Sequence, residues 1–71
     1  MAQQHIYSVS EIVGTSDTSI DDAIRAGIAR TSETIRNVRW FTVKEVRGQV
    51  DGGQIAHFQV TLKVGFTLDE R

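Results

Sequence analysis

The chain has 71 residues, a formal net charge of −1 and no cysteine. A chain of this length forms one domain, residues 1–71, whose small core usually needs reinforcement by disulfides, a metal or self-association. Without cysteine there are no disulfides or Cys-based zinc sites, and His5 and His57 lack the spacing of a ligand pair. We therefore expect self-association and no metal.

The same composition argues against other classes of partner. Eight basic side chains against nine acidic ones give no electrostatic basis for binding a nucleic acid. No apolar run approaches the roughly 18 residues that a membrane span requires. The N-terminal residues are polar and do not resemble a signal peptide, so we expect a cytoplasmic protein without a membrane partner.

The first half of the chain predicts a strand followed by a helix. Residues 6–13 are rich in β-branched and aromatic side chains, and residues 14–16, Gly-Thr-Ser, predict a turn after them. Ser19, with Asp22 three residues later, forms an approximate capping box that predicts a helix start. Asn37 is expected to end the helix. Its apolar stripe comprises Ile20, Ala23, Ile24, Gly27, Ile28, Thr31, Ile35 and Val38.

The second half predicts a hairpin. Residues 39–50 form a second strand, residues 51–53, Asp-Gly-Gly, form a turn, and residues 54–68 form a third strand with nearly perfect alternation. Its apolar face comprises Ala56, Phe58, Val60, Leu62, Val64, Phe66 and Leu68. The predicted fold is α+β, with the order β-α-β-β and a three-stranded antiparallel sheet curled around one helix. The first and second strands pair either directly or through the third.

The second strand contains an irregularity. Phe41 and Val43 share one parity and Val46 has the other, which predicts a β-bulge near Lys44 and Glu45. With this bulge the three apolar residues point to the helix. The single tryptophan, Trp40, then points away from the helix together with Thr42 and Arg47. We expect the third strand to bring Gln59 alongside Trp40 on that face, and it also offers His57.

This placement of Trp40 leaves two interpretations open. Tryptophan and arginine are enriched at protein interfaces, so Trp40 can be an anchor for self-association. A planar ring flanked by hydrogen-bonding groups also suits a planar heteroaromatic ligand, and an arginine can hold a phosphate. The residue pattern alone does not separate these roles.

Four segments, in this order and spacing, resemble the dodecin family: EIVGTS at 11–16, WFTVKEVRG at 40–48, HFQV at 57–60 and KVGF at 63–66. The resemblance covers nearly the whole chain. It implies a hollow homododecamer in which flavins lie at two-fold interfaces between tryptophans of two subunits. A tryptophan at such an interface would be both an anchor for self-association and a platform for the ligand, because the ligands complete the interface.

The resemblance also implies roles for three residues. Trp40 matches the family's stacking tryptophan, Gln59 matches a glutamine that binds the polar edge of the flavin ring, and Arg47 matches an arginine near the phosphate of FMN. Bacterial relatives often have Gly-Phe-Arg-Leu where this chain has Thr67 in place of the arginine. The loss of that cation weakens the preference for phosphorylated flavin and the expectation of coenzyme A, which some bacterial members bind.

We therefore expect a flavin-binding storage or buffering protein for FMN, riboflavin or FAD, and no enzyme. No nucleophile–base pair or carboxylate dyad stands out in the sequence, so no catalytic residue is assigned. The alternative is a structural or adaptor oligomer without a flavin. A flavin-dependent oxidoreductase is disfavoured, because a flavin held between two tryptophans has no face open to a substrate.

Overall fold

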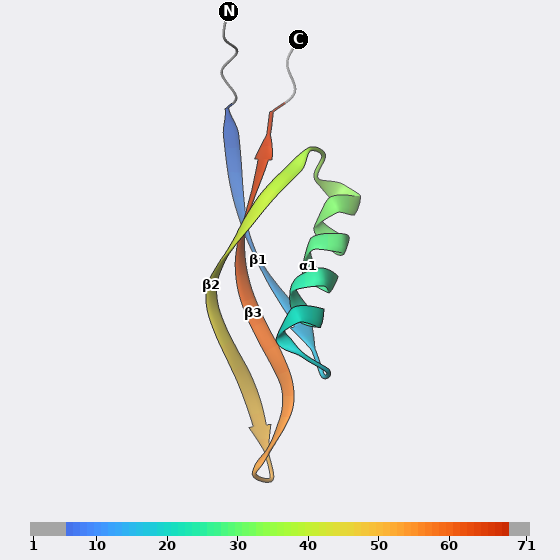
Figure 1. The fold of residues 1–71 in the computed structure, drawn as a ribbon, viewed down its shortest axis with the longest axis vertical. Helices are drawn as coiled ribbons and strands as arrows, with labels where there is room; N and C mark the ends of the chain where they lie inside the picture. The colour runs from blue at the N-terminus through green and yellow to red at the C-terminus, as the bar shows by residue number, and fades with distance from the viewer. Residues whose placement is uncertain (1–5, 69–71) are drawn as a thin grey trace, which may run out of the picture.

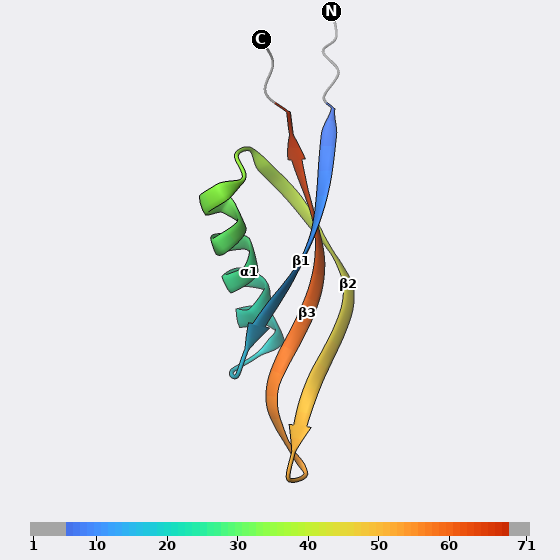
Figure 2. The ribbon, with the colours of Figure 1, turned by 180° about the vertical axis from the view of Figure 1, so that it is seen from behind.

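The computed structural model describes residues 6–68 and consists of three strands and one helix (Figure 1). Strand β1 spans Tyr7–Ser16, helix α1 spans Ile20–Thr34, and strands β2 and β3 span Val38–Asp51 and Gln54–Thr67. The sheet is antiparallel with the order β1-β3-β2, so β1 and β2 pair through β3. The predicted β-α-β-β fold is confirmed. The view from behind (Figure 2) shows the opposite face of this twisted sheet, with β1 crossing in front of β3.

Strand β1 continues through residues 14–16, so the prediction of a turn at these residues was wrong. Gly14 pairs with Val60 inside the β1–β3 ladder, and Ser16 still pairs with Phe58. Gly14 is buried, and a Cβ at this position would collide with the backbone carbonyl of Ala23. The glycine is therefore there because the helix packs closely against the strand, and the chain turns only after residue 16.

The helix begins as predicted but ends earlier. The Ser19 hydroxyl accepts a hydrogen bond from the Asp22 amide at 3.0 Å, which is the expected cap. Asp22 does not return the bond to Ser19; its carboxylate instead accepts from the Ser16 hydroxyl at 2.7 Å. The helix ends at Thr34 and Ile35 is its extended cap, while Val38 begins β2. Ile35 and Val38 were therefore wrongly included in the helical stripe.

The β2–β3 hairpin closes with a two-residue turn at Gly52 and Gly53. Both have positive φ, 62° and 78°, a conformation that favours glycine and suits tight hairpins. The ladder is interrupted between Val38 and Trp40, between Val43 and Glu45, and between Gln49 and Val50. The second interruption leaves Lys44 as the extra residue, which confirms the predicted bulge.

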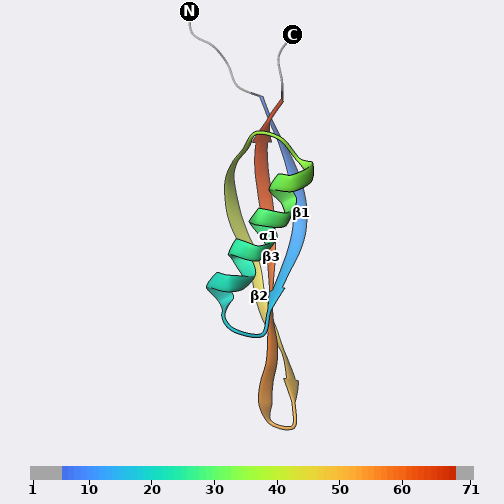
Figure 3. The ribbon, with the colours of Figure 1, turned by 90° about the vertical axis from the view of Figure 1, so that its right-hand side faces the viewer.

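The core lies where the helix crosses the sheet. Val60, Leu62 and Val64 of β3 are fully buried with Ala23 of the helix, and Ile12, Ile24, Ile28 and Val38 pack around them. Figure 3 shows the helix in front of β3 at the middle of the sheet, and the hairpin extends beyond the helix in Figure 1. Because one short helix covers only this part, the outer members of the predicted apolar face of β3 are less buried, and Ala56 and Leu68 are exposed.

Candidate functional site

The face of the sheet turned away from the helix contains all three predicted site residues. Residues that pair across a ladder share a face, and the buried Val60, Leu62 and Val64 define the helix side. Their β2 partners, Val46, Val43 and Phe41, therefore face the helix side as predicted. The opposite side, which we call the outer face, includes Tyr7, Val9, Glu11, Val13, Trp40, Thr42, Glu45, Arg47, Gln59, Thr61, Lys63 and Gly65.

The indole of Trp40 lies against the backbone of Gly65, its partner across the ladder. A Cβ built at Gly65 would overlap the ring carbons Cε2, Cζ2 and Cδ2 of Trp40, so the body of the ring lies across the glycine. The ring of Tyr7, on β1, lies 6.1 Å from that of Trp40 between centroids, at an interplanar angle of 59°. Trp40 remains 39 % exposed. The result is an aromatic surface at one end of the outer face.

Arg47 and Gln59 lie together at a different point of the outer face. They are Cα partners in the β2–β3 ladder. A guanidinium nitrogen of Arg47, Nη2, is 3.3 Å from a carboxylate oxygen of Glu45, and the amide nitrogen of Gln59 is 3.4 Å from Nε2 of His57. The cation and the amide are thus both held by neighbours two residues away on the same strand.

The structure brings Arg47 and Gln59 together but does not bring Trp40 to them. Gly65, the ladder partner of Trp40, lies six residues along β3 from Gln59, the ladder partner of Arg47. At 3.3–3.4 Å per residue this separation corresponds to about 20 Å. The expectation that β3 would bring Gln59 next to Trp40 of the same chain is therefore wrong. Both residues are on the expected face, but along the strand they are separated by more than the width of a three-ring heterocycle.

Two residues of the aromatic surface were not identified from the sequence. Gly65 interrupts the alternation of β3 on its polar side, and a glycine within a strand marks a close approach of another group. The position of Tyr7 could have been found only from the β1–β3 register, which the sequence left open. Counting back from the Gly52-Gly53 turn places Trp40 opposite Gly65, because the extra residues Lys44 on β2 and Ala56 on β3 cancel.

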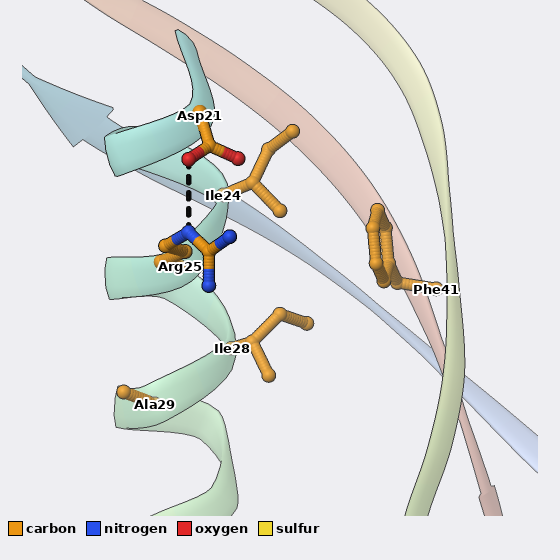
Figure 4. Close-up of a pocket in the computed structure, with 6 residues that line it drawn as sticks. All are labelled: Asp21, Ile24, Arg25, Ile28, Ala29 and Phe41. Atoms are coloured by element: carbon orange, nitrogen blue, oxygen red, sulfur yellow. Dashed lines mark hydrogen bonds and ion pairs between the residues drawn. The ribbon is translucent and has the colours of Figure 1, made fainter. Parts of the chain in front are cut away.

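A groove between the helix and β2 lies on the helix side of the sheet. Figure 4 shows Ile24 and Ile28 pointing from the helix toward Phe41, while Ala29 lies on the edge of the helix away from Phe41. At its edge Nε of Arg25 is 2.8 Å from Asp21, and this hydrogen bond raises the pKa of the Arg25 guanidinium above its ordinary value. The groove is largely apolar because Ile24, Ile28, Ala29 and Phe41 line it. Phe41, Val43 and Val46, on the helix side of β2, are each at least 40 % exposed.

Other kinds of site are not found among residues 6–68. No group of three or more histidine or acidic side chains there could hold a metal ion. The helix in this part of the chain is too short and too polar to cross a membrane.

The chain matches the Dodecin family model over residues 6–69. It is similar to a solved dodecin from Streptomyces davaonensis, with 60% identity over 96% of this chain and 100% of that one and a TM-score of 0.92. A dodecin from Streptomyces coelicolor is 48% identical, with coverage of 99% and 100% and the same TM-score. The curated dodecin of Thermus thermophilus is 43% identical over 92% of this chain and 94% of its own.

Solved structures of the Thermus thermophilus dodecin include a tryptophan-to-phenylalanine variant and two arginine-to-alanine variants. In that protein the tryptophan precedes one arginine by seven positions, and the other arginine follows twenty positions later. Trp40, Arg47 and Thr67 have the same spacing here. The family model and these relatives show that the chain belongs to the dodecin family, whose members are non-enzymatic binding proteins, generally of flavins.

Proposed function

We propose that this protein stores or buffers a flavin by stacking its ring on Trp40. The observation that carries the proposal is the Trp40–Gly65 arrangement, in which an exposed indole lies across the sheet with its body against backbone. Such a surface fits a planar ring system, because stacking needs one accessible aromatic face and a rigid support behind it. The membership of the chain in a family of flavin-binding proteins supports the same ligand.

The site is completed by a second subunit. Gln59 suits the polar edge of the flavin ring and Arg47 suits a phosphate, but both lie about 20 Å along β3 from the partner of Trp40. One flavin therefore stacks on Trp40 of one chain and meets Gln59 and Arg47 of another. We propose a homododecamer with flavins at its two-fold interfaces, where Trp40 is both an interface residue and a ligand platform.

The exposed apolar surface of the single chain supports self-association. Phe41 lines the groove, Val43 and Val46 are exposed on the same side of β2, and Val9 and Val13 are exposed on the outer face. Exposed apolar groups that lie next to one another on both faces of a sheet are typical of a chain that buries them against further copies. Self-association also supplies the stability that the small core of Ala23, Val60, Leu62 and Val64 lacks.

Trp40 selects for the flavin ring, which all flavins share, whereas the choice among flavins depends on the groups near the phosphate. Arg47 provides one cation for a phosphate, and its ion pair with Glu45 is exposed, so it is easily exchanged for a ligand contact. Thr67, at the spacing of the second arginine, provides no charge. We propose FMN or riboflavin as ligands, with FAD as a further candidate and a weaker preference for phosphate than two arginines would give. Coenzyme A binding is disfavoured for the same reason.

Bound flavin should be non-fluorescent. An indole in contact with a photoexcited flavin can donate an electron to it, and the return of that electron restores both rings in the dark. Sequestration between indoles would therefore suppress flavin photochemistry as well as store the ligand. No side chain of this protein needs to transfer a proton for this cycle.

Titration of the apoprotein with FMN and with riboflavin tests the proposal. We expect most of the flavin fluorescence to disappear in proportion to added protein, and Trp40→Ala to prevent the loss. Thr42→Ala, on the same face and strand, is the control that leaves the indole in place. An assembly of the expected mass that quenches neither flavin would favour the alternative, a structural or adaptor oligomer.

A further inference from the structure

Gly65 provides space for Trp40 and is not needed for an unusual backbone conformation. Among residues 6–68 the glycines with positive φ are Gly52 and Gly53, so the backbone at Gly65 would accept an L side chain. Gly65 is buried, although it lies on the polar side of β3. What covers it is the indole, whose ring-fusion carbons occupy the volume where a Cβ would be. The three atoms nearest to a Cβ at residue 65 all belong to the indole, so the ring excludes a side chain there.

Tyr7 limits the ring from the side. Tyr7 pairs with Thr67, two residues along β3 from Gly65, and it therefore lies on the same face as Trp40. A centroid distance of 6.1 Å and an angle of 59° are within the range of favourable tilted aromatic contacts. The two rings come from strands on opposite sides of β3, so each aromatic side chain restricts the rotamers of the other across the central strand.

We propose that Gly65 and Tyr7 are positioning residues that hold the Trp40 indole flat on the outer face before a ligand arrives. This inference deepens the flavin-binding function proposed above and rests on it. A tryptophan free to change rotamer would lose that freedom on stacking, and the loss would weaken binding. With backbone behind it and Tyr7 beside it, the ring has already lost this freedom in the apoprotein. The other side of the ring remains available for stacking.

The test uses substitutions that leave Trp40 in place. Gly65→Ala inserts a methyl group where the ring lies, and we expect FMN binding to weaken by about tenfold or more. Tyr7→Ala removes the lateral contact, and we expect a loss of roughly two- to tenfold, the range that one aromatic pair contributes. Tyr7→Phe keeps the ring and should bind as the natural protein does. Flavin affinity is measured by fluorescence quenching.

A second readout follows the indole without any flavin. The chain contains one tryptophan, so the long-wavelength near-ultraviolet circular dichroism and the emission anisotropy of the apoprotein report on Trp40 alone. We expect both signals to fall in Gly65→Ala and Tyr7→Ala and to persist in Tyr7→Phe. Gly48→Ala is the matched control, because its Cβ would meet a backbone oxygen of His57 at 3.2 Å and no aromatic ring. Glu11→Ala is the control for truncation on the outer face of β1.

The outcomes separate this inference from the proposed function. If the natural protein does not bind flavin, the proposed function fails, and the two spectroscopic signals still decide whether Gly65 and Tyr7 restrain the indole. If Gly65→Ala does not assemble, as judged by light scattering, the Tyr7 series decides. Unchanged Trp40 signals together with unchanged flavin affinity in Gly65→Ala and Tyr7→Ala would overturn the inference.

Discussion

Arg47 and Gln59 face each other across the β2–β3 ladder, and Trp40 lies farther along the same face, opposite Gly65. The groups suited to the edge and the phosphate of a flavin are thus separated from the group suited to its ring. Within one chain Trp40 and Gln59 are too far apart to contact the ring of one flavin together. This separation makes the effect of each substitution specific to one part of the ligand.

Arg47→Ala should discriminate between phosphorylated and unphosphorylated flavin. A hydrogen bond to a charged group contributes about 1.5–3 kcal/mol, and because Arg47 is largely exposed we expect the lower end, or about tenfold weaker FMN binding. Riboflavin affinity should change less than about twofold. Arg30→Ala, which removes an exposed guanidinium from the helix outside the groove at Phe41, is the control. Equal losses for both flavins would show that Arg47 does not contact the phosphate.

Thr67→Arg should increase the preference for FMN. Thr67 is on the outer face, paired with Tyr7 and two residues from Gly65, so an arginine there would add a cation near the ring of Trp40. We expect tighter FMN binding, unchanged riboflavin binding, and a gain that decreases as salt is added, because screening weakens an exposed charge. Thr67→Gln has a similar polar chain without charge and should show no gain. A salt-independent gain in both variants would indicate packing.

Much of this arrangement could be predicted from the sequence. The parity change between Val43 and Val46 predicted a bulge near Lys44 and Glu45, and with this bulge Trp40 lies on the side away from the core. Local patterns carry this information, because alternation and capping depend on neighbours in the chain. The end of β1 could not be predicted in this way. Gly14 resembles a turn residue by type, and its actual role depends on the carbonyl of Ala23 in the packed helix.

The distance between Trp40 and Gln59 is the other feature that pattern alone did not supply. Parity assigns a residue to a face but does not say how far along the strand it lies, which depends on register. The register was available from the Gly52-Gly53 turn, and the two extra residues, Lys44 and Ala56, cancel between the turn and Trp40. The proposed contribution of a second subunit could not be obtained from a pattern within one chain.

Ser19→Ala should reduce stability without changing flavin specificity. Its hydroxyl accepts the Asp22 amide at 3.0 Å, and loss of such a cap costs about 1 kcal/mol of helix stability. We expect a lower urea midpoint at fixed protein concentration, with the ratio of FMN to riboflavin affinity unchanged. Thr18→Ala is the control, because its hydroxyl donates to the neighbouring Asp17 and caps no helical amide. A midpoint shift of the same size in both variants would contradict the capping role.

Phe41→Glu tests whether assembly and flavin binding depend on the groove between the helix and β2. Phe41 is 45 % exposed at this groove, facing Ile24 and Ile28, and burial of a carboxylate there against another subunit would cost several kcal/mol (Figure 4). We expect light scattering to report a smaller assembly, with far-ultraviolet circular dichroism showing that the strands and helix persist. Because Trp40, Arg47 and Gln59 are unchanged, flavin binding is lost only if a second subunit completes the site.

The matched control for that variant is Ser32→Glu, which adds the same charge at an exposed position of the helix. It should keep the natural mass and the natural flavin affinity. An unchanged mass in Phe41→Glu would mean that the groove is not a contact between subunits. A dissociated Phe41→Glu chain that still quenched flavin with full affinity would contradict the composite site. One chain would then have to bring Trp40 and Gln59 to one ligand across about 20 Å of strand, which the register of β2 against β3 does not allow.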